Sequence, residues 1–232
     1  MKKIISCMVL MFFISPVFSQ DGNKDQDKKL DNDKVVQQIY SEEVLEDFES
    51  TSYTPDKNLK FDITNQQVAD LQIRDQFPAQ YDNSKKYLGV KCFGRLGDIF
   101  RIIPAKELVI KKYCKSINVW VYGKNFSGEL QFVVQDVEGT VHNISFGKLT
   151  FNGWRKLTTR IKSKVKQQNE YLEQEKTFRI LYILYKPSND TQVPIWQYFY
   201  LDDITATVRD KYKDNQSDSW GIGFENKNEG SK

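Results

Sequence analysis

The chain has 232 residues, of which 39% are hydrophobic and 28% are charged, a composition typical of globular domains and not of fibrous or wholly disordered chains. The 34 Lys and Arg residues against 31 Asp and Glu residues give a net charge of +3, which argues against a strongly basic nucleic-acid-binding protein. The single histidine, His142, excludes a multi-histidine metal site and leaves one imidazole for any catalytic dyad. We expect His142 to be a surface or cross-strand residue.

The first 19 residues predict a signal peptide. Lys2 and Lys3 form a positively charged start, and Ile4–Ile14 is an apolar run too short to span a bilayer. Val17 and Ser19 occupy the −3 and −1 positions of a cleavage site after Ser19. No second apolar run of about 18 residues follows. We therefore expect an exported protein that does not span the membrane.

Residues 20–44 are predicted to be a charged leader or linker, because Gln20–Lys34 has no apolar face. At its end, Val35–Leu45 is expected to form a short helix where the domain begins. Residues 45–209 are then expected to form one domain, in which short apolar runs alternate with turn residues.

Residues 210–232 are predicted to be a polar, flexible tail. Its two large aromatic residues, Trp220 and Phe224, have no core to join. They indicate either contact with a partner protein or simply the composition of the tail.

The domain is predicted to be all-β. Phe178–Tyr185 is apolar on both faces, which indicates a central strand covered on both sides, and one further helix is expected at Val165–Glu175. A chain with about ten strands and short helical insertions is typical of a jelly-roll β-sandwich. The predicted strands are Val68–Ile73, Tyr87–Phe93, Ile99–Ile103, Ser116–Tyr122, Leu130–Gln135, Thr140–Phe146, Trp154–Ile161, Thr177–Tyr185, Trp196–Leu201 and Ile204–Arg209.

Cys92 and Cys114 are the two cysteines beyond the predicted signal peptide. In an oxidising compartment such a pair can form a disulfide. The alternative is that both are small buried side chains on adjacent strands.

Acidic residues near both ends of the domain suggest a structural calcium site. Asp202 and Asp203 follow an aromatic strand, and Asp47 and Glu49 lie in the opening segment. Carboxylate oxygens are the ligands that calcium prefers. The competing interpretation is that these side chains cap turns by accepting hydrogen bonds from backbone N–H groups.

Aromatic side chains suggest a second kind of site. Trp120, Trp154 and Trp196, with nearby tyrosines, could form a platform on which sugar rings stack, or they could simply pack within the sandwich. The chain contains no phosphate-binding glycine loop, HExxH, CxxC or G-x-S-x-G motif. Adjacent acidic pairs are expected by chance at this acidic content, so we expect no enzymatic activity.

Three segments resemble the FlaA family of spirochaetal flagellar filament outer layer, or sheath, proteins. They are LEDFES at 45–50, the long segment Val119–Leu157 with its W-V-Y-G-x-N and G-x-L-x-F-x-G-W patterns, and YFYLDDI at 198–204. Jelly-roll carbohydrate-binding modules also use an opening D-F-E and a closing D-D-I.

The resemblance implies a non-enzymatic structural protein of the periplasm. Such a protein would coat the flagellin core of the periplasmic flagellum, with other sheath proteins as neighbours, and would shape or stiffen the filament for motility. The alternative function is a periplasmic carbohydrate-binding module.

Overall fold

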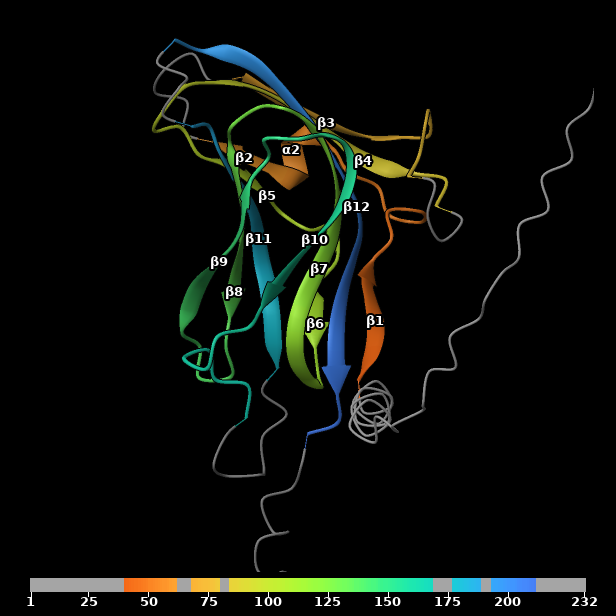
Figure 1. The fold of residues 1–232 in the computed structure, drawn as a ribbon, viewed down its shortest axis with the longest axis vertical. Coiled ribbons are helices and arrows are strands. Elements are labelled where there is room, and N and C mark those ends of the chain that lie inside the picture. The colour runs from red at the N-terminus through yellow and green to blue at the C-terminus, as the bar shows by residue number, and fades with distance from the viewer. Residues whose placement is uncertain (1–39, 62–67, 80–83, 169–176, 189–192, 212–232) are drawn as a thin grey trace, which may run out of the picture. The chain divides into compact units, whose positions relative to one another are not determined.

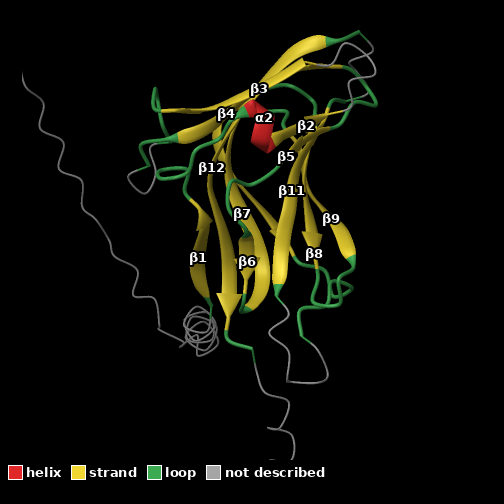
Figure 2. Cartoon of the chain, turned by 180° about the vertical axis from the view of Figure 1, so that it is seen from behind, coloured by secondary structure: helices red, strands yellow, loops and turns green. Residues whose placement is uncertain are grey.

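The protein is a sandwich of two antiparallel β-sheets, each of six strands (Figure 1). The computed structural model describes residues 40–61, 68–79, 84–168, 177–188 and 193–211. The predicted signal peptide and the tail residues Trp220 and Phe224 lie outside the described residues. Figure 2 shows that the regular secondary structure is made of strands joined by loops, with a short helix, α2 (Pro55–Asn58). The jelly-roll β-sandwich prediction is confirmed.

The first sheet has the order β10-β7-β12-β4-β3, and β1 also pairs with β12. The long strand β12 therefore lies at its centre and pairs with β7 on one side and with β4 and β1 on the other. The bounds of these strands are β1 Ser41–Glu46, β3 Val68–Arg74, β4 Tyr87–Gly94, β7 Tyr113–Lys124, β10 Asn152–Arg160 and β12 Ile195–Arg209.

The second sheet has the order β2-β5-β11-β8-β9, and β6 also pairs with β11. The expectation that Phe178–Tyr185 forms a central strand is confirmed, because β11 occupies the middle of this sheet. The bounds are β2 Leu59–Phe61, β5 Phe100–Ile102, β6 Leu108–Ile110, β8 Glu129–Gln135, β9 Val141–Lys148 and β11 Phe178–Lys186.

The core lies between the two sheets and is built by alternation along each strand. On β7, Ile117, Val119 and Val121 are fully buried and face the second sheet. Across the core, the ring of Tyr185 on β11 lies 4.6 Å from that of Phe199 on β12, centroid to centroid. The Tyr185 hydroxyl donates a 2.5 Å hydrogen bond to Gln197 Oε1. The phenol thus gains a buried acceptor in an otherwise apolar interior.

Several local predictions are wrong. Ser41–Glu46 forms β1 and not a helix, because pairing with Thr205–Val208 of β12 decides its conformation. The two strands predicted at Trp196–Leu201 and Ile204–Arg209 are one strand with a bulge at Asp202–Asp203. The described part of the predicted helix at Val165–Glu175, residues 165–168, is not helical.

The predicted disulfide is also wrong. Cys92 and Cys114 are free and buried. Cys92 on β4 pairs with Gln197 near the start of β12, whereas Cys114 on β7 pairs with Val208 near its end. β12 separates the two strands, and eleven residues along it correspond to about 36 Å. A disulfide needs Cα atoms within about 7 Å.

The two ends of the described domain lie together. Ser41 of β1 pairs with Val208 of β12, so the chain enters and leaves the sandwich at the same end, the lower end in Figure 1. No helix among the described residues is long and apolar enough to cross a membrane.

Candidate binding face on the first sheet

The outer face of the first sheet carries a row of aromatic side chains. Trp196, Tyr198 and Tyr200 alternate along β12 with buried residues that face the core. Because successive side chains of a strand point to opposite faces, all three project away from the core. Trp196 is 40% exposed, which is unusual for a tryptophan in a sheet and makes it the most accessible of the three.

The strand register adds aromatic residues from three neighbouring strands. Tyr200 pairs with Tyr122 on β7, which in turn pairs with Trp154 on β10. The Tyr122 and Tyr200 rings are stacked at 5.2 Å, and Trp154 meets Tyr122 edge-on at 5.5 Å. Tyr87 of β4 lies 5.1 Å from Tyr200 and 5.5 Å from Trp154. We call Tyr87, Tyr122, Trp154 and Tyr200 the aromatic cluster.

Two lysines lie over the aromatic row. Lys91 Nζ is 4.1 Å from the centre of the Trp196 ring and 5.8 Å from that of Tyr198. Lys124 Nζ is 5.8 Å from the centre of the Tyr200 ring. These are cation–π distances. The row therefore offers flat apolar area together with hydrogen-bond donors of positive charge.

A small hollow of about 80 Å³ lies beside Tyr198 and Tyr200, over Gly89 of β4. Lys91, Asp70 and Gln72 also line it. A Cβ atom at Gly89 would lie 2.7 Å from Cδ of Arg74, so the missing side chain lets Arg74 cross the face. The hollow combines aromatic, cationic and carboxylate groups within one short stretch of the sheet.

Below the aromatic row the same face becomes polar. The bulge at Asp202–Asp203 shifts the register, and beyond it Thr205 and Asn118 face outward beside Glu42 of β1. The Glu42 carboxylate accepts hydrogen bonds from Lys156 Nζ at 2.6 Å, from Asn118 Nδ2 at 3.3 Å and from Thr205 Oγ1. Burial by itself would raise the pKa of Glu42, but these donors lower it overall.

Asp202 marks the boundary between the aromatic and polar halves. It pairs with Trp120 and has no exposed surface. Its Oδ2 accepts a 2.7 Å hydrogen bond from Ser84 Oγ, and its Oδ1 accepts one from the Asp203 N–H at 2.9 Å. Burial raises the pKa of Asp202 to about 7, and the negative charges of Asp203 and Glu49 act in the same direction.

The other predicted calcium ligands bind backbone groups. Glu49 Oε1 accepts hydrogen bonds from the N–H groups of Lys85 and Lys86 at 2.5 and 2.9 Å, and Asp47 Oδ1 accepts one from the Glu49 N–H at 3.1 Å. Within the described ranges, no three His, Cys, Asp or Glu side chains are grouped so that they could hold a metal ion. These hydrogen bonds are those expected of turn-capping residues. The calcium site stays a prediction.

Glu46 is a buried carboxylate that was not singled out in the sequence. It has no exposed surface and accepts hydrogen bonds from the Phe48 N–H and Thr51 Oγ1, both at 3.0 Å, and from the Tyr53 hydroxyl at 3.4 Å. Glu46 lies among other acidic residues in the opening segment, and the sequence alone does not show which of these side chains points into the core.

His142 is a cross-strand residue, as expected. Its Nε2 lies 2.8 Å from Oδ2 of Asp136, and its side chain is 13% exposed. Asp136 Oδ1 also accepts hydrogen bonds from the N–H groups of Glu138 and Thr140. The pair thus closes the turn between β8 and β9, where Gly139 has a positive φ of 88°.

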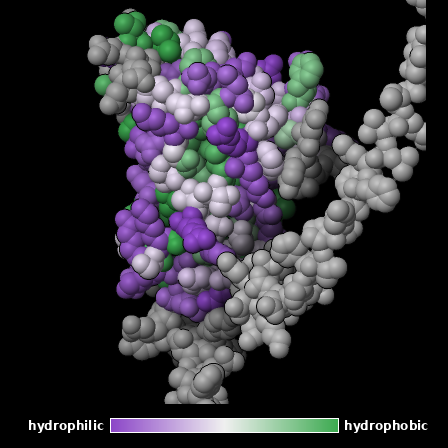
Figure 3. Space-filling view, in the orientation of Figure 1, coloured by the Kyte–Doolittle hydropathy of each residue, from purple (hydrophilic) through white to green (hydrophobic). Residues whose placement is uncertain are grey.

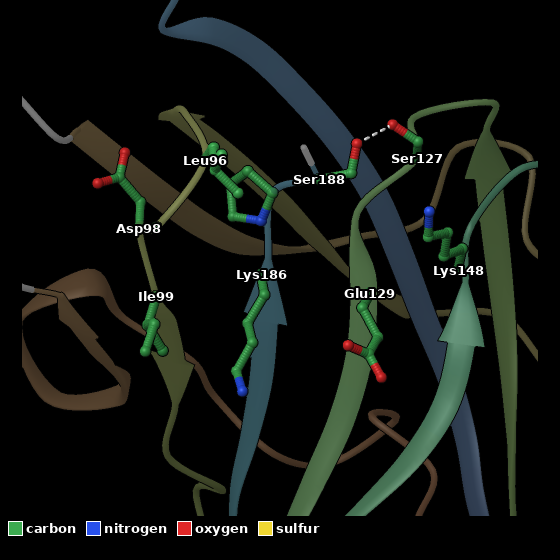
Figure 4. A pocket seen from close by; sticks show the side chains of 10 residues that line it. Leu96, Asp98, Ile99, Ser127, Glu129, Lys148, Lys186 and Ser188 are labelled. Carbon is green, nitrogen blue, oxygen red and sulfur yellow. Dashed lines mark hydrogen bonds between the residues drawn. The ribbon is translucent and has the colours of Figure 1, made fainter. Parts of the chain in front are cut away.

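A separate cavity of about 370 Å³ lies on the second sheet (Figure 4). Register places Lys186, Glu129 and Lys148 in one row across β11, β8 and β9. The Ser127 and Ser188 hydroxyls are hydrogen-bonded at its rim. Hydrogen bonding from Ser145 and the nearby lysines lower the pKa of Glu129. The lining comes from four separate segments of the chain, so the sequence does not indicate this cavity.

The three tryptophans named as a stacking platform lie on the same outer face but at different places. Trp154 belongs to the aromatic cluster, and Trp120 lies at the polar boundary opposite Asp202 and Lys156. Trp196 lies four residues from Tyr200, which is about 13 Å along the strand. A continuous aromatic surface forms only when Tyr198, Tyr200 and Tyr122 connect Trp196 with Trp154.

A β-sandwich with an aromatic outer sheet face and no grouped metal ligands among the described residues belongs to a class whose members differ widely in function. Comparison with known proteins identifies the family. Residues 80–216, more than half of the chain, match the family described as flagellar filament outer layer protein FlaA. The chain belongs to this family.

A relative and several solved structures show further similarity. A "Putative flagellar filament outer layer-like protein" of Brachyspira hyodysenteriae is 28% identical over 149 residues, which are 60% of this chain and 67% of the relative. A carbohydrate-binding module of the β-sandwich superfamily has a TM-score of 0.46 at 10% identity, over 69% of this chain and 60% of that chain. The family 11 carbohydrate-binding module of a Clostridium thermocellum cellulosomal cellulase has a TM-score of 0.42 at 11% identity, over 74% and 97%.

Proposed function

We propose that this protein is a structural subunit of the outer layer of a periplasmic flagellar filament, where it binds the flagellin core and neighbouring sheath proteins. Membership of the outer layer family supports a place on the flagellar filament. In this proposal the protein stiffens or shapes the filament and does not catalyse a reaction.

The aromatic row of the first sheet is the observation that supports a particular surface as the binding face. Trp196 is the most exposed aromatic residue of this row, and Lys91 and Lys124 lie over the row. Aromatic side chains with a polar rim are typical of the centres of protein interfaces. The row and the adjoining aromatic cluster lie on a sheet and not on loops, so their geometry is set by the backbone hydrogen bonds of β4, β7, β10 and β12.

A coat subunit needs several contacts, and each can be weak. A standard interface buries about 800 Å² on each partner, which is comparable with one face of a small sandwich. Contacts repeated along a filament add by multivalency. One strong face is therefore sufficient for attachment when neighbouring subunits supply the rest.

The test is to purify periplasmic flagella, wash them with salt and measure the ratio of this protein to flagellin. A fixed ratio that survives washing supports the proposal, as does a thinner or less curved filament when the gene is deleted. Trp196→Ala should weaken retention on the filament, whereas Val141→Ala should not, because Val141 is an even more exposed residue (53% against 40%) of β9 on the other sheet. Release of the wild-type protein into the soluble periplasm, with unchanged filaments in the deletion strain, would defeat the proposal.

The aromatic row also favours a second candidate function, binding of carbohydrate. Flat rings beside polar groups suit the stacking of sugar rings, and the hollow over Gly89 adds Asp70, Gln72 and Lys91 as hydrogen-bonding groups. A panel of soluble oligosaccharides would then shift the NMR signals of the Trp196 and Tyr198 side chains. Tyr198→Ala should abolish that shift. The absence of any response across a broad panel would exclude this candidate.

A further inference from the structure

The lower end of the sandwich in Figure 1, opposite the aromatic row, carries a dense group of basic side chains. Its segments are the β6–β7 turn, the end of β10 with the segment that follows, and the end of β12. Figure 3 shows this end of the described domain as hydrophilic. We call this surface the basic end, formed by Lys111, Lys112, Lys115, Arg160, Lys162, Lys164, Lys166, Arg209 and Lys211.

Hydrogen bonds hold the segments of the basic end together. Gln167 accepts a 2.7 Å hydrogen bond from the Cys114 N–H and donates one of 2.8 Å to the Cys114 carbonyl. The Ile161 N–H donates to the Lys115 carbonyl at 3.0 Å, and the Val137 N–H donates to the Lys166 carbonyl at 3.1 Å. The segment 160–168 is therefore fixed against β7 and the β8–β9 turn.

Alternating burial directs the charges outward. Val165 and Gln167 are 5% and 6% exposed and anchor the segment, whereas Lys162, Lys164 and Lys166 are exposed. Val165, between Lys164 and Lys166, and Gln167, directly after Lys166, hold the backbone in place while the lysine side chains stay exposed. The ammonium groups thus project from a fixed base, and less backbone entropy is lost when a ligand binds there.

Few carboxylates balance these charges. Lys166 is paired with Glu138 at 2.7 Å, and Lys112 lies 3.9 Å from Asp210. In the described part of the chain, no carboxylate lies within ion-pair distance of Lys162, Lys164 or Lys111. The whole chain has a net charge of only +3, so the basic end is a local excess and not a general property of the protein.

We propose that the basic end is a docking surface for an acidic protein segment. Lys162 and Lys164, exposed on a fixed base, attract such a segment over about a Debye length, roughly 8 Å at physiological salt. A membrane surface is the less suitable partner, because none of the large hydrophobic residues found exposed in the described chain lies within 111–115 or 160–168 and membrane-surface segments insert apolar side chains. This inference rests on the proposed coat function, because that function places the acidic partner on the flagellar filament.

The first experiment measures the surface directly. A fluorescent ten-residue oligo-glutamate peptide is titrated with the wild-type protein, with the Lys162→Glu/Lys164→Glu variant and with the Lys57→Glu/Lys60→Glu variant. Both pairs are exposed and change the net charge equally, but Lys57 and Lys60 lie at α2 and β2. We expect the Lys162→Glu/Lys164→Glu variant to bind the peptide at least tenfold more weakly and with a smaller dependence on salt. The Lys57→Glu/Lys60→Glu control should change the affinity less than twofold. Circular dichroism melts confirm that both variants fold.

The second experiment uses filaments purified from cells that lack this protein. Wild-type protein should co-sediment with them at 150 mM salt, and the Lys162→Glu/Lys164→Glu variant should not. Equal weakening by the two charge-reversed variants, or tighter binding of the wild type to anionic phosphatidylglycerol vesicles than to the peptide, would overturn the inference. If the wild type binds the peptide through these lysines but not the filaments, the coat function fails and the acidic-partner surface stands.

Discussion

Ser84 Oγ and Asp202 Oδ2 are joined by a 2.7 Å hydrogen bond that ties the segment before β4 to the bulge of β12. The two residues are 118 positions apart in the chain. The bond holds a fully buried carboxyl group at the point where the first sheet changes from aromatic to polar, so the ionisation of Asp202 is linked to the stability of the fold.

Asp202 should make stability depend on pH. Its pKa is raised to about 7 in the folded protein, against about 3.9 in an unfolded chain. The folded state therefore binds the proton more tightly, and the free energy of unfolding should fall as pH rises from about 4 through 7. Asp202→Asn keeps one oxygen as acceptor for the Asp203 N–H and turns an NH2 group toward the Ser84 hydroxyl, which can accept from it. Because it carries no charge, it should remove this decline and gain roughly 1–3 kcal/mol at pH 8. Urea unfolding from pH 5 to 8 tests this, and parallel curves for the two proteins would contradict it.

The predicted calcium site should act through the same carboxyl group. Binding requires ionised carboxylates, so calcium should raise the melting temperature at pH 8 and have little effect at pH 5. Asp202→Asn should abolish the rise, and magnesium serves as the control cation. Identical melting curves in calcium and in chelator at pH 8 would rule out a stabilising site.

Glu46 should be one of the most sensitive polar residues of the domain. Glu46→Ala leaves the buried Phe48 N–H and the Thr51 hydroxyl without their acceptor, which costs about 2–4 kcal/mol in unfolding free energy. Glu43→Ala, on the same strand but partly exposed, should cost less than about 0.5 kcal/mol. Chemical denaturation compares the two variants, and equal losses would show that the burial of Glu46 is not the cause.

Cys92 and Cys114 should behave as inert thiols. Burial raises the pKa of Cys114 to about 12 and that of Cys92 even further, and the thiolate is the reactive form. Neither should react with Ellman's reagent at pH 8 until the protein is unfolded, when both should react. A reducing agent should leave the melting temperature unchanged. A melting temperature that falls in the reducing agent would indicate a disulfide and contradict the separation of the two strands.

The aromatic cluster should contribute to stability separately from binding. Tyr122→Leu removes ring contacts to both Tyr200 and Trp154 and should cost about 1–2 kcal/mol. A double-mutant cycle with Tyr200→Leu should give a coupling energy of about 0.5–1.5 kcal/mol. Purely additive losses in thermal or urea unfolding would show that the rings do not act together.

Prediction succeeded where the pattern is local. Alternation along Ser116–Tyr122 and Leu130–Gln135 identified β7 and β8, since burial of one face requires apolar residues at every second position. It failed for β1, because Ser41–Glu46 is acidic and becomes a strand only through pairing with β12. It also missed β2 and β6, whose three residues show at most one alternation; β5 is equally short but lies within the longer, mostly apolar run Ile99–Ile103.

The candidate site shows the same division. The aromatic residues of β12 could be recognised in the sequence as one alternating set, but their union with Tyr87, Tyr122 and Trp154 depends on the order of four strands. The predicted disulfide was wrong for the same reason, because the insertion of β12 between β4 and β7 separates two cysteines that are only 22 residues apart in the chain.

The sequence by itself determined the all-β class, most of the strands and the family resemblance, because these depend on residue type and short spacing. The tertiary structure alone decided which acids are buried, which aromatic rings meet and where lysines gather into the basic end. Those features depend on strand order and register, which bring together residues distant in the chain, and the energy of a charge or a ring is set by its neighbours in space.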